Sequence, residues 1–207
     1  MGEAPPGAVA ELVAVMRRLR AECPWKQEQT HRSLVRYLLE ETYETVDAID
    51  AGETSGDWSH LAEELGDVLL QVVFHAAIAE ERGEFDLDDV ARGITAKMRR
   101  RNPHVFGDVD GAGLDAAEVD ALWQRMKAAE KPAGAAAGAA ASPLPSGLPA
   151  LLYADKALAR RERAGLPVPD AGTGLGERLL ALVAEARAAG VDPEEALRDV
   201  VRGLEVG

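Results

Sequence analysis

The sequence predicts an all-α protein. Hydrophobic residues make up 47% of the 207 residues and aromatic residues only 4%, a composition that favours helices packed through aliphatic stripes over aromatic-rich sheets. Apolar residues recur at three- and four-residue steps along most of the chain, as amphipathic helices require. An Ala-, Gly- and Pro-rich segment at residues 131–147 is expected to link two helical regions, 8–130 and 148–207.

Five helices are expected in the first region. They span residues 8–21, 33–51, 59–82 and 86–101, with a fifth that begins at residue 115. Gly52 and Gly83 each follow an apolar stripe and are expected to end it in the left-handed conformation, which makes residues 53–57 a loop. Acidic residues with helix-capping spacing mark the later starts, namely Asp86 with Asp89 and Asp115 with Glu118.

The apolar pattern of the second region predicts three more helices. This region resembles a degenerate copy of the first. The helices are expected over residues 151–164, 175–189 and 192–204, the last capped by Asp192. Leu175-Gly176-Glu177 parallels Leu65-Gly66-Asp67, which indicates an internal repeat. In that alignment Gly174 replaces Glu64, and no acidic helix precedes it. We therefore expect the second region to be non-catalytic and to brace the first.

The charge of the chain excludes several classes of partner. Acidic residues outnumber basic ones 36 to 23, which gives a net charge of −13 and disfavours nucleic acids and anionic membranes as partners. No stretch approaches the length of a membrane span, and the single Cys23 cannot form an intramolecular disulfide. The first residues lack a signal-peptide pattern, so a cytoplasmic protein is expected.

An acid-acid-x-x-acid pattern occurs on each of the second and third predicted helices. The two copies are Glu40-Glu41-Thr42-Tyr43-Glu44 and Glu63-Glu64-Leu65-Gly66-Asp67. Acids three apart share a helix face, so two antiparallel helices could direct four carboxylates into one pocket. An all-oxygen cluster suits Mg²⁺ or Mn²⁺. Ordinary solvated helix faces are the alternative, but Gly66 costs about 1 kcal/mol in mid-helix and suggests close packing or ligand approach.

A basic strip and two tryptophans are candidates for substrate binding. The strip comprises Lys97, Arg99, Arg100 and Arg101. Positive side chains at the end of a helix interact favourably with the negative end of its dipole, and this explains the presence of Arg99. Lys97 and Arg101 lie on the same helix face and could bind phosphates. Trp123 is expected either to pack in the core or to stack on a nucleobase. Trp25 is expected either to cover the pocket or to pack inside the helical bundle. The four histidines and Cys23 are expected to be structural.

Together these motifs resemble the MazG family of all-α nucleoside triphosphate pyrophosphohydrolases. Cys23-Pro24-Trp25 and Arg101-Asn102-Pro103-His104-Val105-Phe106 extend the resemblance beyond the acids. It implies hydrolysis of a nucleoside triphosphate to a monophosphate and pyrophosphate, in a homodimer or larger homo-oligomer. By this resemblance the Mg²⁺ ligands are Glu41, Glu44, Glu64 and Asp67, and Glu40 and Glu63 are catalytic candidates, either as residues that support these ligands or as the base that activates water. The resemblance also implies that Lys97 and Arg101 bind the triphosphate and favours stacking of Trp123 on the base. Arg100 and Trp25 complete the candidate substrate-binding residues.

Other functions remain as alternatives. Related helical pyrophosphohydrolases that act on phosphoribosyl-ATP or deoxyuridine nucleotides would carry similar carboxylates. A di-iron four-helix protein requires Glu-x-x-His motifs, which neither acidic cluster contains. A non-catalytic nucleotide-sensing module is disfavoured because the acids of the first region are complete. No Gly-rich phosphate-binding loop is present, which excludes an ordinary P-loop ATPase.

Overall fold

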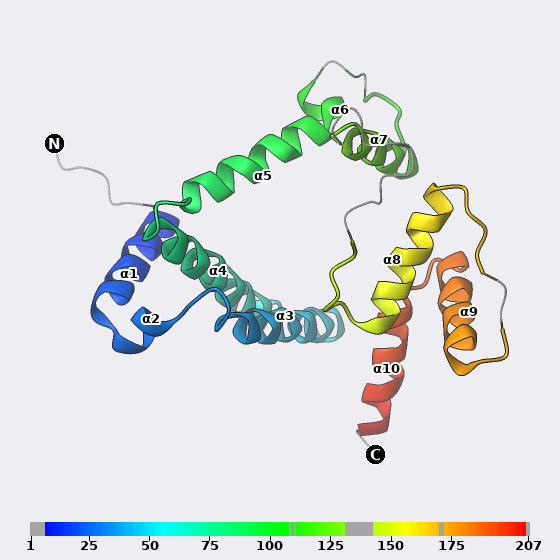
Figure 1. Cartoon of the computed structure of the whole chain (residues 1–207), viewed down its shortest axis with the longest axis horizontal. Helices are drawn as coiled ribbons and strands as arrows, with labels where there is room; N and C mark the ends of the chain where they lie inside the picture. Colours follow the sequence, from blue (N-terminus) through cyan, green and yellow to red (C-terminus); the bar gives the residue numbers. More distant parts are fainter. Residues whose placement is uncertain (1–6, 108, 110, 131–142, 170–171, 206–207) are drawn as a thin grey trace. The chain divides into compact units, whose positions relative to one another are not determined.

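The computed structural model describes residues 7–107, 109, 111–130, 143–169 and 172–205. Every regular element within these residues is a helix, from α1 to α10 (Figure 1), which confirms the predicted all-α class. The chain divides into two compact units, one ending at residue 132 and the other beginning at residue 133. No described helix is long and apolar enough to cross a membrane. Most of the predicted linker, residues 131–142, lies outside the described residues.

The first unit contains seven described helices. They are α1 (Ala8–Glu22), α2 (Pro24–Glu28), α3 (Val35–Ser55), α4 (Ser59–Glu80), α5 (Leu87–Arg101), α6 (Pro103–Phe106) and α7 (Ala116–Ala129). The caps of α5 and α7 are those that the sequence predicts: the carboxylate of Asp86 accepts from the Asp89 amide at 2.8 Å, and that of Asp115 accepts from the Glu118 amide at 2.8 Å. The short helices α2 and α6, each begun by a proline, were not predicted.

The predicted end of α3 at Gly52 is wrong. The helix continues through Gly52 to Ser55 and ends at Gly56, whose φ of 75° is left-handed. Gly52 serves a different purpose, because a Cβ at this position would stand 2.5 Å from Cε3 of Trp58. The indole of Trp58 therefore requires a glycine beneath it, and the predicted loop 53–57 contracts to residues 56–58. Gly83, with a φ of 67°, follows α4 as predicted.

The core of this unit lies around the second half of α4. Its buried members come from α1, from the turn before α3 and from α4: Met16, Leu34, Val73, Phe74, Ala77 and Ile78. Arg17 on α1 pairs with Glu80 at the end of α4, Nη2 to Oε1 2.7 Å. Nδ1 of His31, in the turn, lies 2.8 Å from Nδ1 of His75 on α4. These contacts fix α1 and the start of α3 against α4.

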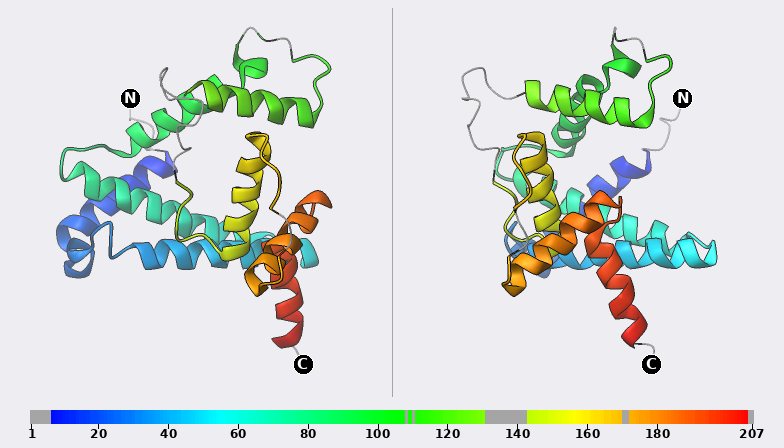
Figure 2. Two further views of the ribbon diagram at one scale, coloured as in Figure 1. Left: turned by 45° about the vertical axis from the view of Figure 1, so that its right-hand side comes forward. Right: turned by 90° about the vertical axis from the view of Figure 1, so that its right-hand side faces the viewer.

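The helices α3 and α4 form the hairpin that positions the candidate site. Only residues 56–58 connect them, so the two helices run antiparallel and pack along each other, as Figures 1 and 2 both show. At the end of the hairpin near this connection the two helices lie outside the core described above. Several apolar side chains along the two helices are exposed in the described part of the chain: Leu39, Tyr43, Ile49, Leu65, Leu69 and Val72. Beyond α4, helix α5 contacts both α4 and α7.

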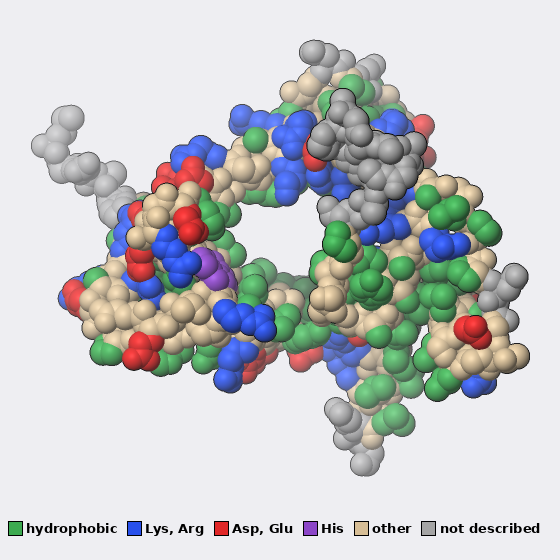
Figure 3. Space-filling view, viewed as in Figure 1, with side chains coloured by type: hydrophobic (Ala, Val, Ile, Leu, Met, Phe, Trp, Pro, Cys, Tyr) green, Lys and Arg blue, Asp and Glu red, His purple; other side chains and the backbone are tan. Residues whose placement is uncertain are grey.

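The second unit is a small three-helix arrangement. It consists of α8 (Ala150–Arg163), α9 (Leu175–Ala188) and α10 (Pro193–Glu205), and α8 contacts both of the others. Its buried apolar residues are Leu158, Ala159 and Val183. Asp192 accepts from the Glu194 and Glu195 amides at 2.8 and 3.1 Å and caps α10 as predicted. Hydrophobic side chains are visible over this unit in the space-filling view (Figure 3).

Candidate metal centre

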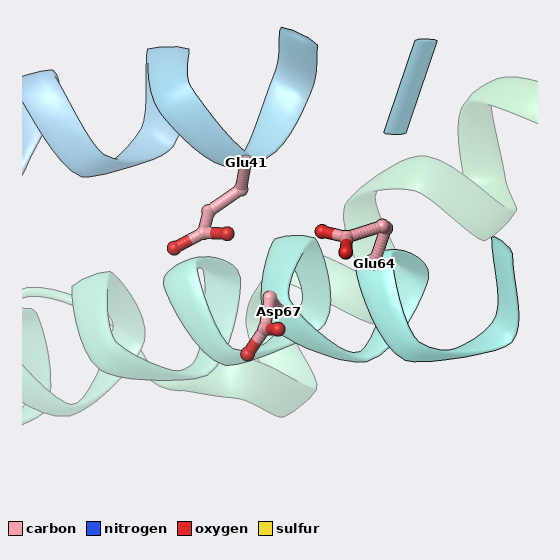
Figure 4. Close-up of side chains that lie close together, drawn as sticks. All are labelled: Glu41, Glu64 and Asp67. Atoms are coloured by element: carbon pink, nitrogen blue, oxygen red, sulfur yellow. The ribbon is translucent and has the colours of Figure 1, made fainter. Parts of the chain in front are cut away.

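Three of the predicted ligands converge between α3 and α4. Glu41 extends from α3, and Glu64 and Asp67 extend from α4 toward it (Figure 4). One carboxylate oxygen from each of the three lies within 4.8 Å of the others. Glu64 and Asp67 are three residues apart and share a helix face, while the antiparallel hairpin brings Glu41 opposite them. The group is therefore built by local periodicity on one helix and by tertiary packing with the other.

These carboxylates are close together and partly withdrawn from water. Glu64 is only 8% exposed on the most apolar helix, and its Oε1 lies 3.4 Å from Nδ1 of His60. Burial raises the pKa of Glu41, and the negative charges of Asp67, Glu44 and Glu64 raise it further. Like charges held this close oppose ionisation. A divalent cation would neutralise them, and carboxylate oxygens are the donors that hard cations such as Mg²⁺ prefer.

The remaining acids of the two motifs lie at the margin of this group. Glu44 is exposed, and its negative charge is one of those that raise the pKa of Glu41. It stands outside the three-carboxylate group but adjoins it through Glu41. Glu40 and Glu63 are both exposed, and Oε2 of Glu63 lies 3.9 Å from Nδ1 of His60. The roles assigned to Glu44, Glu40 and Glu63 by the sequence stay predictions.

Gly66 is surrounded by open space within the described chain. A Cβ at this position would meet no atom within 4 Å, so the close packing that its sequence position suggested does not occur between the described parts of one chain. Approach of a ligand, the other reason that the sequence suggested for this glycine, stays a prediction. Gly66 lies between two of the candidate ligands, Glu64 and Asp67.

The basic strip meets Trp123 and an acid that the sequence analysis missed. Lys and Arg side chains gather along α5 (Figure 3). At its end Nη2 of Arg100 and Nη2 of Arg101 contact the carboxylate of Glu130 at 2.7 and 2.6 Å. The Arg101 guanidinium carbon also lies 5.1 Å from the ring centre of Trp123. Lys97, one turn earlier on α5, is half-buried.

Glu130 follows α7 and is about thirty residues from its partners, so no local pattern indicates the pairing. Hydrogen bonds from Arg101 first, and then from Arg100, lower its pKa to about 2. The carboxylate is therefore ionised at neutral pH. From the sequence, a dense cluster of arginines predicts that some anion pairs with it. It does not indicate which acidic residue does so.

The other tryptophans occupy the N-terminal end of the unit and the hairpin connection. Trp25 is 46% exposed and packs edge-on against Tyr37, with ring centres 5.9 Å apart. It therefore does not plug the bundle. Lys26 places its ammonium group 4.9 Å from the centre of the Trp25 ring. Trp58, which the sequence analysis did not consider, contacts Gly52 as described above.

Comparison with known proteins identifies the family. The sequence pattern of the MazG nucleotide pyrophosphohydrolase domain matches residues 29–106, a range that contains both acidic motifs and the basic strip. An uncharacterized 26.1 kDa protein of Streptomyces cacaoi is 48% identical over 93% of this chain and 78% of its own length.

Two named relatives also match 93% of the chain. The nucleoside triphosphate pyrophosphohydrolase/pyrophosphatase MazG of Thermotoga maritima is 37% identical, with 80% of its length covered. The nucleoside triphosphate pyrophosphohydrolase of Mycobacterium tuberculosis is 41% identical, but the chain spans only 54% of that protein. Because both acidic motifs lie in the matched domain and these relatives match nearly the whole chain, the chain belongs to the MazG family of nucleotide pyrophosphohydrolases.

Proposed function

We propose that this protein is a Mg²⁺-dependent pyrophosphohydrolase that cleaves (d)NTPs between the α and β phosphates, releasing a nucleoside monophosphate and pyrophosphate. The observation that carries the proposal is the convergence of Glu41, Glu64 and Asp67 within 4.8 Å. Family membership supports the same chemistry. Removal of non-standard nucleotides is a role that fits such an activity.

The acids of the hairpin divide into two roles in this proposal. Glu41, Glu64 and Asp67, together with the adjoining Glu44, would hold Mg²⁺, and Mn²⁺ would substitute for it. The ion, when bound, offsets phosphate charge and makes a water molecule more acidic. Glu40 and Glu63, exposed beside these ligands, are the candidates to accept the proton of the attacking water.

The basic strip and the tryptophans provide the substrate contacts in this proposal. Lys97, Arg100 and Arg101 neutralise phosphate oxygens, whose charge increases as the bond to the leaving pyrophosphate breaks. Trp123, which already lies under a guanidinium group, offers a flat surface to the nucleobase. Trp25, which is 46% exposed beside Tyr37 and Lys26, would cover the substrate.

A product-resolved screen tests the proposal. The protein is incubated with Mg²⁺ and each common, oxidised or deoxyuridine triphosphate, and with phosphoribosyl-ATP, and the products are separated by ion-exchange chromatography. We expect equal amounts of a nucleoside monophosphate and pyrophosphate from at least one triphosphate. Release of a diphosphate and inorganic phosphate, or turnover of phosphoribosyl-ATP alone, would contradict the proposed reaction.

We also propose that the second unit is non-catalytic. Among its described residues it has no group of acids comparable to the one between α3 and α4, and Gly174 occupies the place that aligns with Glu64. A shortened chain that ends at residue 131 should retain most of its pyrophosphate release per folded molecule. Residues 148–207 alone should release none, and measurable turnover by that fragment would refute this assignment.

A homodimer or larger homo-oligomer is the third part of the proposal. The apolar side chains of α3 and α4 named above are exposed in the described part of the chain. Such surfaces commonly form subunit interfaces. Light scattering at micromolar concentration should therefore give a multiple of the 22.0 kDa chain mass. A mass of one chain would contradict this prediction.

A further inference from the structure

One carboxylate engages both arginines at the end of the basic strip. Oε1 of Glu130 accepts from Nε of Arg100 at 2.8 Å, and its two oxygens accept from Nε and Nη2 of Arg101 at 3.1 and 2.6 Å. The contact with Arg101 is thus bidentate, the geometry in which a guanidinium group binds a carboxylate or a phosphate most strongly. The Arg101 side chain is only 14% exposed, and that of Glu130 is 25% exposed.

The charges at this place do not balance. Two guanidinium groups face one carboxylate, so the cluster retains a net positive charge of one. A phosphate group carries up to two negative charges and more oxygen acceptors than a carboxylate, and it would neutralise both arginines. If Glu130 stayed in place beside such a phosphate, the two anions would repel each other.

We propose that Glu130 and a phosphate group of the substrate compete for the same two guanidinium groups, Arg100 and Arg101. This inference rests on the proposed function, which assigns these arginines to the phosphates. Glu130 is then a specificity-determining residue. An anion must displace it to bind, so a polyphosphate is favoured over weaker anions that carry a single charge.

Protonation does not remove this competitor at neutral pH, because the arginines hold the pKa of Glu130 at about 2. The carboxylate must instead move away from both guanidinium groups. Its position suits such a movement, because Glu130 follows the last residue of α7 and its backbone amide donates only to Ala128 within the described chain. We infer that a change of its side-chain rotamer releases the arginines.

The test compares binding by variants of the full chain. Isothermal titration calorimetry measures the affinity for inorganic pyrophosphate and for a non-hydrolysable α,β-methylene triphosphate, both with Mg²⁺. Glu130→Gln keeps the shape but removes the competing charge, and we expect it to tighten binding of both ligands about fivefold or more. Glu80→Gln is the matched control, because Glu80 forms a bidentate pair with Arg17 elsewhere in the unit; it should leave the affinity unchanged.

A double-mutant cycle separates competition from a general loss of negative charge. Glu130→Gln should have little effect in a background that carries both Arg100→Gln and Arg101→Gln, since both competed guanidinium groups are then gone. Equal or weaker binding by Glu130→Gln alone, or an equal gain in the background that lacks both arginines, would overturn the inference. Failure of the proposed function has a different signature: no triphosphate is hydrolysed, whatever the effect of Glu130→Gln on pyrophosphate binding.

Discussion

The same three-residue pattern, Leu-Gly-acid, has different structural settings in the two units. In the first unit Asp67 lies in the third turn of α4, and its carboxylate faces Glu41 on the neighbouring helix. In the second unit Glu177 lies in the first turn of α9, and its carboxylate accepts from the Gly174 amide at 2.9 Å. A helix start leaves amide groups without partners, and a nearby acid satisfies them.

The comparison shows that the position of the pattern within its helix determines the use of the acid. The helix α4 begins two turns before Asp67, so its own amides are satisfied there and the carboxylate is available to a ligand. Helix α9 begins at Leu175, so Glu177 serves the backbone. The described residues between α8 and α9 form no helix, so within them nothing corresponds to the acidic helix α3 that precedes α4.

Neutralising the acid of the Leu-Gly-acid pattern should affect pyrophosphate release far more in the first unit than in the second, and this is the largest effect that we expect. Asp67→Asn or Glu41→Gln should lower pyrophosphate release by at least about 100-fold, because each removes a charged oxygen donor of the proposed Mg²⁺ site. Their circular dichroism should stay that of the natural protein, since loss of a charge relieves repulsion between the acids. Glu177→Gln, the matched control, should change turnover less than twofold. Loss of folding in both first-unit variants would assign these acids to structure instead.

Substituting the glycine of each Leu-Gly-acid pattern, Gly66 or Gly176, should give a smaller difference in turnover between the units. Gly66 and Gly176 both face open space in the described chain, so alanine fits sterically at either position. If a ligand approaches between Glu64 and Asp67, a methyl group at Gly66 would obstruct it, so we expect Gly66→Ala to lower turnover several-fold. Gly176→Ala should leave turnover unchanged and raise the stability of α9 by at most about 1 kcal/mol. Full activity of Gly66→Ala would show that nothing approaches this glycine.

The pH dependence of stability should also differ between the units, because all four histidines lie in the first. Burial, followed by the proximity of His31, lowers the pKa of His75 below 6.5 in the folded protein. As the pH falls below about 6.5 the unfolded chain therefore binds a proton that the folded chain does not, and stability decreases. Hydrogen exchange between pH 7 and 5.5 should report faster opening around α4, an effect that His75→Gln reduces. Equal acceleration in α9 would contradict this cause.

Local chemistry made much of the fold predictable. Capping acids such as Asp86, Asp115 and Asp192 mark helix starts within a few residues, so sequence alone places them. The end of α3 was misplaced because the requirement for Gly52 is tertiary: Trp58, six residues later, packs on it. A glycine that makes room for a ring and a glycine that ends a helix look alike in the sequence.

The candidate site was predictable to the extent that it depends on helix periodicity. The three-residue spacing places Glu64 and Asp67 on one face, but periodicity did not decide between Glu40 and Glu41, because that depends on how α3 is rotated against α4. In the structure Glu41 is the acid that faces α4. The pairing of Glu130 with the arginines depends on the placement of α7 beside α5, for which the sequence carries no periodic signal.

The central claim is that the acids between α3 and α4 act through a divalent cation. Its most direct test is pyrophosphate release from a triphosphate substrate after exhaustive treatment with EDTA, followed by stepwise addition of Mg²⁺ to the natural protein and to Asp67→Asn. We expect no release after chelation, restoration by Mg²⁺ or Mn²⁺ in the natural protein, and no restoration in Asp67→Asn at the same concentrations. Full turnover in excess EDTA would contradict the claim.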